Sequence, residues 1–228
     1  MGFNPADYVV LEPKSIPVIL LLDTSSSMSG EKISKLNKAV ETMIDEFKKA
    51  QTMEKFIKVA IITFGNNGVN LHTPLTEVDK VNFNPLTTGG MTPMGTALRM
   101  AKDMIEDKNI IKSRDYRPAI VLVSDGQPND EWRKPLDDFV NTGRTKKCDR
   151  LALAIGRDAD MDVLNMFIKG CENPVFFAED AKDIVEKFKQ ITMSVTMRAK
   201  SSNPNQSINI SNTLDREETD DDLDDFEF

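Results

Sequence analysis

Four short stretches of mainly apolar residues, many of them branched, form the clearest pattern in the chain. They span residues 16–22, 56–64, 119–123 and 151–155. Because polar residues do not alternate regularly with apolar ones in them, the stretches are typical of strands that are buried on both faces of a parallel sheet. We therefore expect four central strands.

Helical spacing of apolar residues fills most of the chain between these strands. Apolar residues recur three or four positions apart in five segments, which indicates helices with one buried face. The helices are expected at residues 33–47, 94–105, 163–168 and 184–195, and from about residue 131.

Two further segments predict the edges of the sheet. Residues 69–75 alternate in polarity after the turn sequence Gly65-Asn66-Asn67-Gly68, which favours an antiparallel edge strand. Residues 174–177 predict a short strand at the other edge. Strands that alternate with helices predict an α/β fold: a doubly wound, mostly parallel sheet with one antiparallel edge strand and helices on both faces.

The charge of the chain is concentrated at its C-terminal end. The net charge is −8, and residues 215–228 contain nine acidic residues and one basic residue, which leaves 28 of each elsewhere. From Lys200 the sequence becomes rich in Ser, Asn and Pro and then acidic, with too few apolar groups to offset the entropy of ordering. We expect one domain at residues 1–199 and a flexible tail at residues 200–228.

Composition excludes several classes of function. The sequence does not indicate the basic face that nucleic-acid binding would need. The longest apolar run, residues 18–22, is far shorter than the roughly 20 residues of a membrane helix. The start of the chain lacks the pattern of a signal peptide, so we expect a cytoplasmic protein. The one histidine, His72, is expected to be a strand residue, and Cys148 and Cys171 to be reduced, buried thiols.

A cluster of oxygen-bearing side chains directly follows the first apolar run. Asp23, Ser25 and Ser27 lie two positions apart. Residues two apart in an extended loop point the same way, so the three side chains are able to converge. One carboxylate and two hydroxyls are hard oxygen donors, which suit Mg²⁺, Mn²⁺ or Ca²⁺. The alternative is that the serines serve only as helix caps and turn residues.

Two later loops carry the same kind of donor. Thr92 precedes a predicted helix in Gly89-Gly90-Met91-Thr92-Pro93, and Asp125 follows the third apolar run. In open α/β sheets, ligands bind beyond the C-terminal ends of the strands, where we expect these loops to lie. Thr92 before a proline also fits a helix N-cap, and Asp125-Gly126 also fits a turn, so these alternatives stay open. The coincidence of three such loops favours a metal site.

These residues together resemble a known metal site. Asp23-x-Ser25-x-Ser27, Thr92 and Asp125-Gly126 are similar to the metal-ion-dependent adhesion site of von Willebrand factor A (VWA) domains. The resemblance covers about residues 16–195 and implies the fold predicted above. The string Gly-Gly-x-Thr-Pro-Met-Gly and the segment 116–132 resemble the bacterial tellurite-resistance TerY-like branch. Ser26 stands where many members carry glycine, at a position that is not a ligand.

The resemblance implies how the site would hold a metal, which we expect to be Mg²⁺, with Ca²⁺ or Mn²⁺ as alternatives. Ser25 and Ser27 would bind the cation directly, and Thr92 directly or through water. Asp23 and Asp125 would act mainly through bridging waters, unless one of them binds directly. Mostly neutral ligands would leave the cation with a position open for an Asp or Glu of a protein partner.

By the same resemblance, the chain is expected to be an adaptor or scaffold module in a bacterial stress-response or defence system. Neither nucleic acid nor a membrane is expected as a partner. The acidic tail suggests a further hypothesis, since a tethered carboxylate has a high local concentration. One tail acid would then fill the open metal position, in its own chain or in a second copy. A solvated tail or a docking peptide is the simpler alternative.

Two other functions remain open. The first is a metal-dependent phosphohydrolase, because two carboxylates and a metal support phosphoryl chemistry. Against it, Ser25 stands where a haloacid-dehalogenase-type phosphatase would carry a second Asp, and no P-loop pattern occurs. The second is a scaffold with a vestigial metal site, against which all five ligand positions carry competent residue types. We therefore expect no enzymatic activity.

Overall fold

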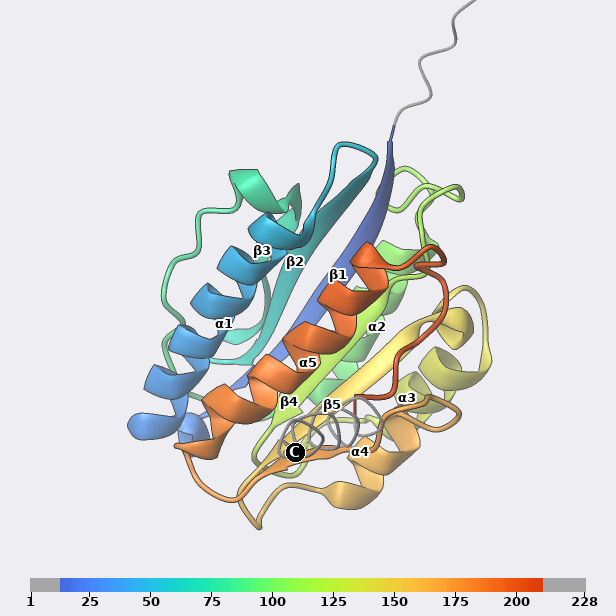
Figure 1. The fold of residues 1–228 in the computed structure, drawn as a ribbon. Helices are drawn as coiled ribbons and strands as arrows, with labels where there is room; N and C mark the ends of the chain where they lie inside the picture. Colours follow the sequence, from blue (N-terminus) through green and yellow to red (C-terminus); the bar gives the residue numbers. More distant parts are fainter. Residues whose placement is uncertain (1–12, 211–228) are drawn as a thin grey trace, which may run out of the picture.

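A six-stranded sheet forms the centre of the protein, in the strand order β3-β2-β1-β4-β5-β6 (Figure 1). The structure is a computed structural model that describes residues 13–210. All neighbouring strands are parallel except β2 and β3, which form the antiparallel edge. The strands are β1 (Lys14–Thr24), β2 (Lys55–Gly65), β3 (Gly68–Glu77), β4 (Ala119–Ser124), β5 (Asp149–Ile155) and β6 (Phe176–Ala178).

Helices cover both faces of this sheet (Figure 1). Helices α1 (Glu31–Ala50) and α5 (Asp183–Lys200) pack side by side on one face. Helices α2 (Met94–Glu106), α3 (Arg133–Asn141) and α4 (Met161–Phe167) cover the other. Three single-turn helices, η2 (Ser26–Met28), η3 (Val78–Lys80) and η4 (Thr145–Lys147), lie in the connections. The doubly wound α/β fold expected from the sequence is confirmed.

The apolar runs are unbroken because each strand contributes to two cores. In β1, Val18, Leu20 and Leu22 pack into the core under α1 and α5. Ile19 and Leu21 pack into the core under α2, α3 and α4. Successive side chains of a strand point to opposite faces, so a strand covered on both sides needs apolar residues at every position.

The parallel register brings two polar strand ends together. Leu22 of β1 lies opposite Val123 of β4, so the residues that follow, Asp23 and Ser124, meet at one edge of the sheet. This edge lies at the C-terminal ends of the strands, where open α/β sheets bind ligands.

Part of the segment that was expected to be flexible packs against the domain. Residues 201–210, which we expected to be flexible, return along the body of the domain. Ser207 donates a hydrogen bond to Asp149 at the start of β5, and Ile210, only 1% exposed, is bonded through its N–H to Asn173. Polar side chains provide the anchoring that the apolar content does not. The acidic residues 215–228 lie outside the described residues.

Smaller expectations also meet the structure. His72 is a residue of strand β3, as expected. Both cysteines are free thiols; Cys148 is buried, whereas Cys171 is half-buried. Burial raises the pKa of the Cys148 thiol to about 12. Within residues 13–210, no helix is long and apolar enough to span a membrane.

Candidate metal centre

Asp23 is held rigidly at the end of β1 and is fully buried. One carboxylate oxygen accepts a hydrogen bond from the Ser25 N–H at 2.9 Å. The other accepts one from the Ser124 hydroxyl, at the end of β4, at 2.7 Å. A buried carboxylate needs such donors, because an ionised group without them would be strongly destabilising.

Ser25 and Ser27 connect Asp23 to Asp125, through the N–H and hydroxyl of Ser25 and the hydroxyl of Ser27. Ser25 Oγ and Ser27 Oγ are 2.9 Å apart, and Ser27 Oγ donates to Asp125 Oδ1 at 2.7 Å. The short helix η2 turns the chain directly after Ser25, so that Ser25 and Ser27 face the same point. Four of the five residues singled out from the sequence therefore lie in one hydrogen-bonded chain.

Thr92 lies on a third loop that is bonded to the first two. The Gly90 carbonyl accepts hydrogen bonds from the N–H and the hydroxyl of Ser26. The Thr92 carbonyl accepts from Asn129, which follows β4. Thr92 itself is 8% exposed, and its hydroxyl makes none of the hydrogen bonds found among the described residues. Its position fits the predicted site, with a hydroxyl available to a ligand.

The N-cap that was one alternative for Thr92 is not formed. Helix α2 begins at Met94, and its first N–H groups are bonded by a different residue. The Asp130 carboxylate accepts from the N–H groups of Gly95 and Thr96, at 2.9 and 2.8 Å. A carboxylate at a helix N-terminus is stabilising, since it satisfies donors that lack partners within the helix. Asp130 thereby fixes α2 against the loop that carries Asp125.

A lysine supplies a positive charge at this site. Lys32 Nζ of α1 lies 2.5 Å from Asp125 Oδ2, whose side chain is 0% exposed, while the lysine side chain is 31% exposed. The ammonium group donates to Oδ2 of Asp125, while Oδ1 of the same carboxylate accepts the hydrogen bond from Ser27. The site thus already attracts a cation.

Three residues of the site were not identified from the sequence. Ser124 orients Asp23, Lys32 neutralises Asp125, and Asp130 caps α2. Ser124 was recoverable, because it directly precedes Asp125 at a strand end. Lys32 and Asp130 act on residues 93 and 35 positions away, respectively, and no local pattern marks such contacts.

The donor set fits a hard divalent cation. Two carboxylates and three hydroxyls from three loops supply oxygen ligands only, which Mg²⁺, Mn²⁺ and Ca²⁺ prefer. None of these five side chains offers a nitrogen or sulfur donor, which soft metals prefer. Lys32 occupies the place of a cation at Asp125.

Burial predicts a pH dependence of metal binding. Desolvation raises the pKa of Asp23 to about 6, although hydrogen bonds from Ser25 and Ser124 oppose the shift. Below pH 6 the Asp23 carboxyl group is mainly protonated in the metal-free site, and this proton must leave before a cation binds. The Mg²⁺ affinity should therefore fall as the pH decreases through 6. Titration calorimetry between pH 5 and 7.5 should show about a tenfold loss per pH unit below that value. A flat profile would contradict this expectation.

Removing the lysine should strengthen metal binding. In Lys32→Met, Asp125 loses a competing cation, and the Mg²⁺ affinity should rise by about tenfold, equivalent to roughly 1.4 kcal/mol. Lys35→Met, on the same helix, removes the same charge and is the matched control. Calorimetry on both variants decides the matter, and equal affinities would show that Lys32 does not compete.

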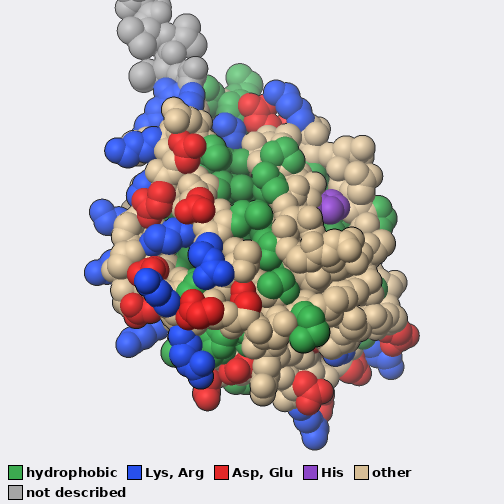
Figure 2. All heavy atoms as spheres, turned by 180° about the vertical axis from the view of Figure 1, so that it is seen from behind, with side chains coloured by type: hydrophobic (Ala, Val, Ile, Leu, Met, Phe, Trp, Pro, Cys, Tyr) green, Lys and Arg blue, Asp and Glu red, His purple; other side chains and the backbone are tan. Residues whose placement is uncertain are grey.

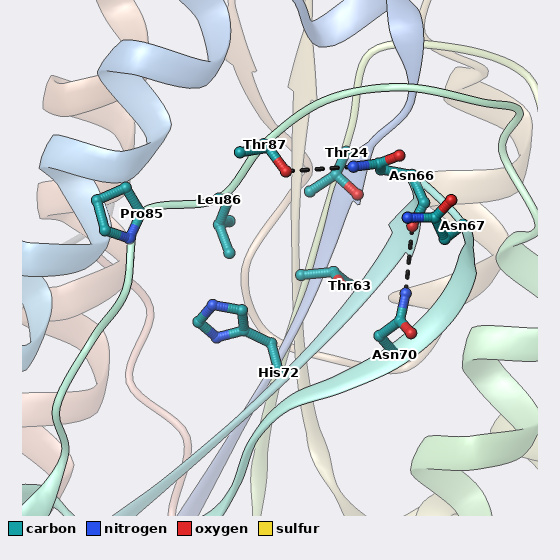
Figure 3. Close-up of a pocket in the computed structure, with 9 residues that line it drawn as sticks. All are labelled: Thr24, Thr63, Asn66, Asn67, Asn70, His72, Pro85, Leu86 and Thr87. Atoms are coloured by element: carbon teal, nitrogen blue, oxygen red, sulfur yellow. Dashed lines mark hydrogen bonds between the residues drawn. The ribbon is translucent and has the colours of Figure 1, made fainter.

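A polar pocket adjoins the metal loop (Figure 3). Thr24, between Asp23 and Ser25, lines it together with Thr63, Asn66 and His72. Asn66 donates a hydrogen bond across it to the Thr87 hydroxyl at 3.2 Å. No Asp, Glu, Lys or Arg side chain lines this pocket, and burial lowers the pKa of His72. In Figure 2 the histidine lies among uncharged atoms. The pocket beside the metal loop is therefore polar and free of these charged side chains.

Comparison with known proteins agrees with this arrangement. The sequence model of the von Willebrand factor type A domain matches residues 18–190. The chain belongs to this family. VWA domains commonly serve as metal-dependent protein-interaction modules. No curated protein matches the chain significantly.

Solved structures share the VWA fold at low sequence identity. Proximal thread matrix protein 1 from the mussel byssus superposes with a TM-score of 0.64 at 17% identity, over 79% of this chain and 48% of that one. A further structure of that protein has zinc in its metal-ion-dependent adhesion site (MIDAS) motif. The pilus adhesin SpaC of Lactobacillus rhamnosus GG gives 0.62 at 14% identity, over 80% and 30%. This VWA domain thus spans less than half the length of these relatives.

Proposed function

We propose that this VWA domain is a metal-dependent protein-binding module that captures an Asp or Glu of its partner. The observation that carries the proposal is the hydrogen-bonded chain from Asp23 through Ser25 and Ser27 to Asp125. Three loops of different strands place these oxygen donors and Thr92 at one edge of the sheet. Such a set of oxygen donors suits a hard divalent cation.

Each residue of the site would have its own role in holding the metal ion. Ser25, Ser27 and Thr92 would hold the ion through neutral hydroxyls, while Asp23 and Asp125 would act mainly through water. A divalent cation, for which we propose Mg²⁺, supplies a charge that such ligands leave partly unneutralised, with a position open to a partner's carboxylate. Ser124 holds the carboxylate of Asp23 in place, and Lys32 holds that of Asp125.

The surface around the site supports a protein partner. Met91, next to Thr92, is 65% exposed. An exposed methionine beside a polar site suits the mixed character of protein interfaces. This side chain would pack against the partner residue that reaches the metal.

The metal site is tested by titration calorimetry with Mg²⁺. The double variant Ser25→Ala/Ser27→Ala should lose binding, because it removes both direct hydroxyl ligands. Ser29→Ala removes a hydroxyl of the same loop that bonds to Thr88 instead, and it should bind normally. Failure of the wild-type chain to bind Mg²⁺, Mn²⁺ or Ca²⁺ would support the vestigial-site alternative.

Carboxylate capture needs a separate test. We expect the peptide Gly-Asp-Gly, but not Gly-Asn-Gly, to shift the NMR signals of residues 25–29 and 88–92 when Mg²⁺ is present. A chelator should abolish the shifts. Equal shifts with both peptides would exclude carboxylate recognition even if the metal binds.

We further propose that the domain binds and does not catalyse. Among the described residues, the lysine nearest the two carboxylates is paired with Asp125, and His72 lies in the adjoining pocket. Neither is placed as a free base. A phosphate-ester hydrolysis assay with Mg²⁺ should therefore show no turnover. A role in a bacterial stress or defence system, in the TerY-like branch, and a cytoplasmic location are parts of the same proposal and rest on the sequence resemblance.

A further inference from the structure

A second cavity lies at the opposite edge of the sheet from the metal centre. It has a volume of about 480 Å³ and lies beside Tyr116, Arg117 and Pro118, which directly precede β4. Ile105, in the last turn of helix α2, and Asn205, from the returning C-terminal segment, also line it. Figure 1 shows these connections at the end of the sheet away from the loop that follows β1.

Four cationic side chains from three segments converge on this cavity: Lys108, Arg117, Arg144 and Lys147. The ion pairs found within residues 13–210 include none of them. One carboxylate, that of Asp115, also lines the cavity, but its oxygens accept hydrogen bonds from the N–H groups of Ser15 and Lys112. The cavity therefore carries an excess of positive charge.

The arginines are held in place without being neutralised. Arg117 donates to the carbonyls of Asn205 and Cys148, and Arg144 to those of Ile105 and Lys112. Carbonyl oxygens orient a guanidinium group but do not cancel its charge. The Nε of Arg117 is buried and has no acceptor. Buried donors of this kind normally have a partner, and an oxygen of a bound anion would provide one here.

A nearby group responds to the uncompensated charge. The pKa of Arg198 is lowered, mainly by burial, and the positive charge of Arg117 adds to this shift. Arg198 is balanced by Asp149, whereas Arg117 has no such partner among the described residues. Like charges held close together destabilise a fold unless an anion binds between them.

From this convergence we propose that the cavity binds an organic phosphate. The phosphate would lie against Arg117, Arg144 and the two lysines, since guanidinium groups match phosphate oxygens in geometry. The organic part would lie against the ring of Tyr116 and against Pro118. This binding is independent of the metal centre and of the function proposed for it.

Phenyl phosphate is a suitable probe, with inorganic phosphate and phenol as partial ligands. We expect titration calorimetry on the full chain to show phenyl phosphate binding more tightly than inorganic phosphate, and phenol not binding. The double variant Lys108→Gln/Lys147→Gln should weaken binding by roughly tenfold, because each exposed charge contributes modestly. Both lysines are exposed, so thermal unfolding should be unchanged.

The control variant is Lys48→Gln/Lys49→Gln, which removes the same charge from lysines paired with acids of their own helix. It should bind like the wild type. Absence of phenyl phosphate binding, or equal weakening in both double variants, would overturn the proposal. The proposal would also be overturned if phenyl phosphate bound only to a chain that lacks residues 215–228. The acidic residues of the chain itself, and not a phosphate, would then be the ligand of the cavity.

Discussion

The variant Arg198→Met is expected to lose about 3–5 kcal/mol of the free energy of unfolding, because it leaves a buried carboxylate without its counter-charge. Arg198 and Asp149 are both 0% exposed, and Nη1 of Arg198 lies 2.8 Å from Asp149 Oδ2. The guanidinium also donates to the carbonyls of Arg117 and Pro204. One side chain thus joins α5, the start of β5 and the segment that follows α5.

Urea denaturation measures the free energy of unfolding of this variant, and two further variants serve as comparisons. Arg157→Met breaks an ion pair whose side chains are 84% and 64% exposed, and it should cost less than about 1 kcal/mol. The double variant Asp149→Leu/Arg198→Met removes both buried charges and should recover much of the loss. Similar small losses in Arg198→Met and Arg157→Met would show that the buried pair contributes little.

The variant Gly65→Ala is expected to reduce stability by about 1–3 kcal/mol and to weaken Mg²⁺ binding at the same time. A Cβ atom at Gly65 would overlap the carbonyl of Thr24 and the amide nitrogen of Ser25. That backbone connects two proposed metal-site residues, Asp23 and Ser25, so relief of the overlap must displace them. The φ angle of Gly65, +150°, is also unfavourable for alanine.

Gly68→Ala separates the two causes. Gly68 has a positive φ of +94°, but a Cβ there would meet no atom within 4 Å. This variant should therefore lose stability through backbone strain and keep its Mg²⁺ affinity. Thermal unfolding and calorimetry on both variants test the idea, which fails if Gly65→Ala binds Mg²⁺ as tightly as the wild type.

The sequence alone was sufficient for the fold class and for most of the candidate site. Strands that are covered on both faces must be apolar at every position, so the apolar pattern of residues 16–22 and 119–123 predicted central strands. Residues at the ends of parallel strands meet at one edge, so Asp23 and Asp125 were expected to lie together. Both expectations depend only on the local period of the chain and on general rules of sheet topology.

The tertiary structure alone decided the contacts that tune and anchor these elements. Lys32 at Asp125, Asp130 at the start of α2 and Arg198 at Asp149 each join residues that are at least 35 positions apart. The packing of residues 201–210 and the basic cavity beside Arg117 arise in the same way. A polar or charged side chain leaves no periodic pattern in a sequence, because its partner is set by the path of the whole chain. Only the folded structure therefore shows which charges are neutralised and which are not.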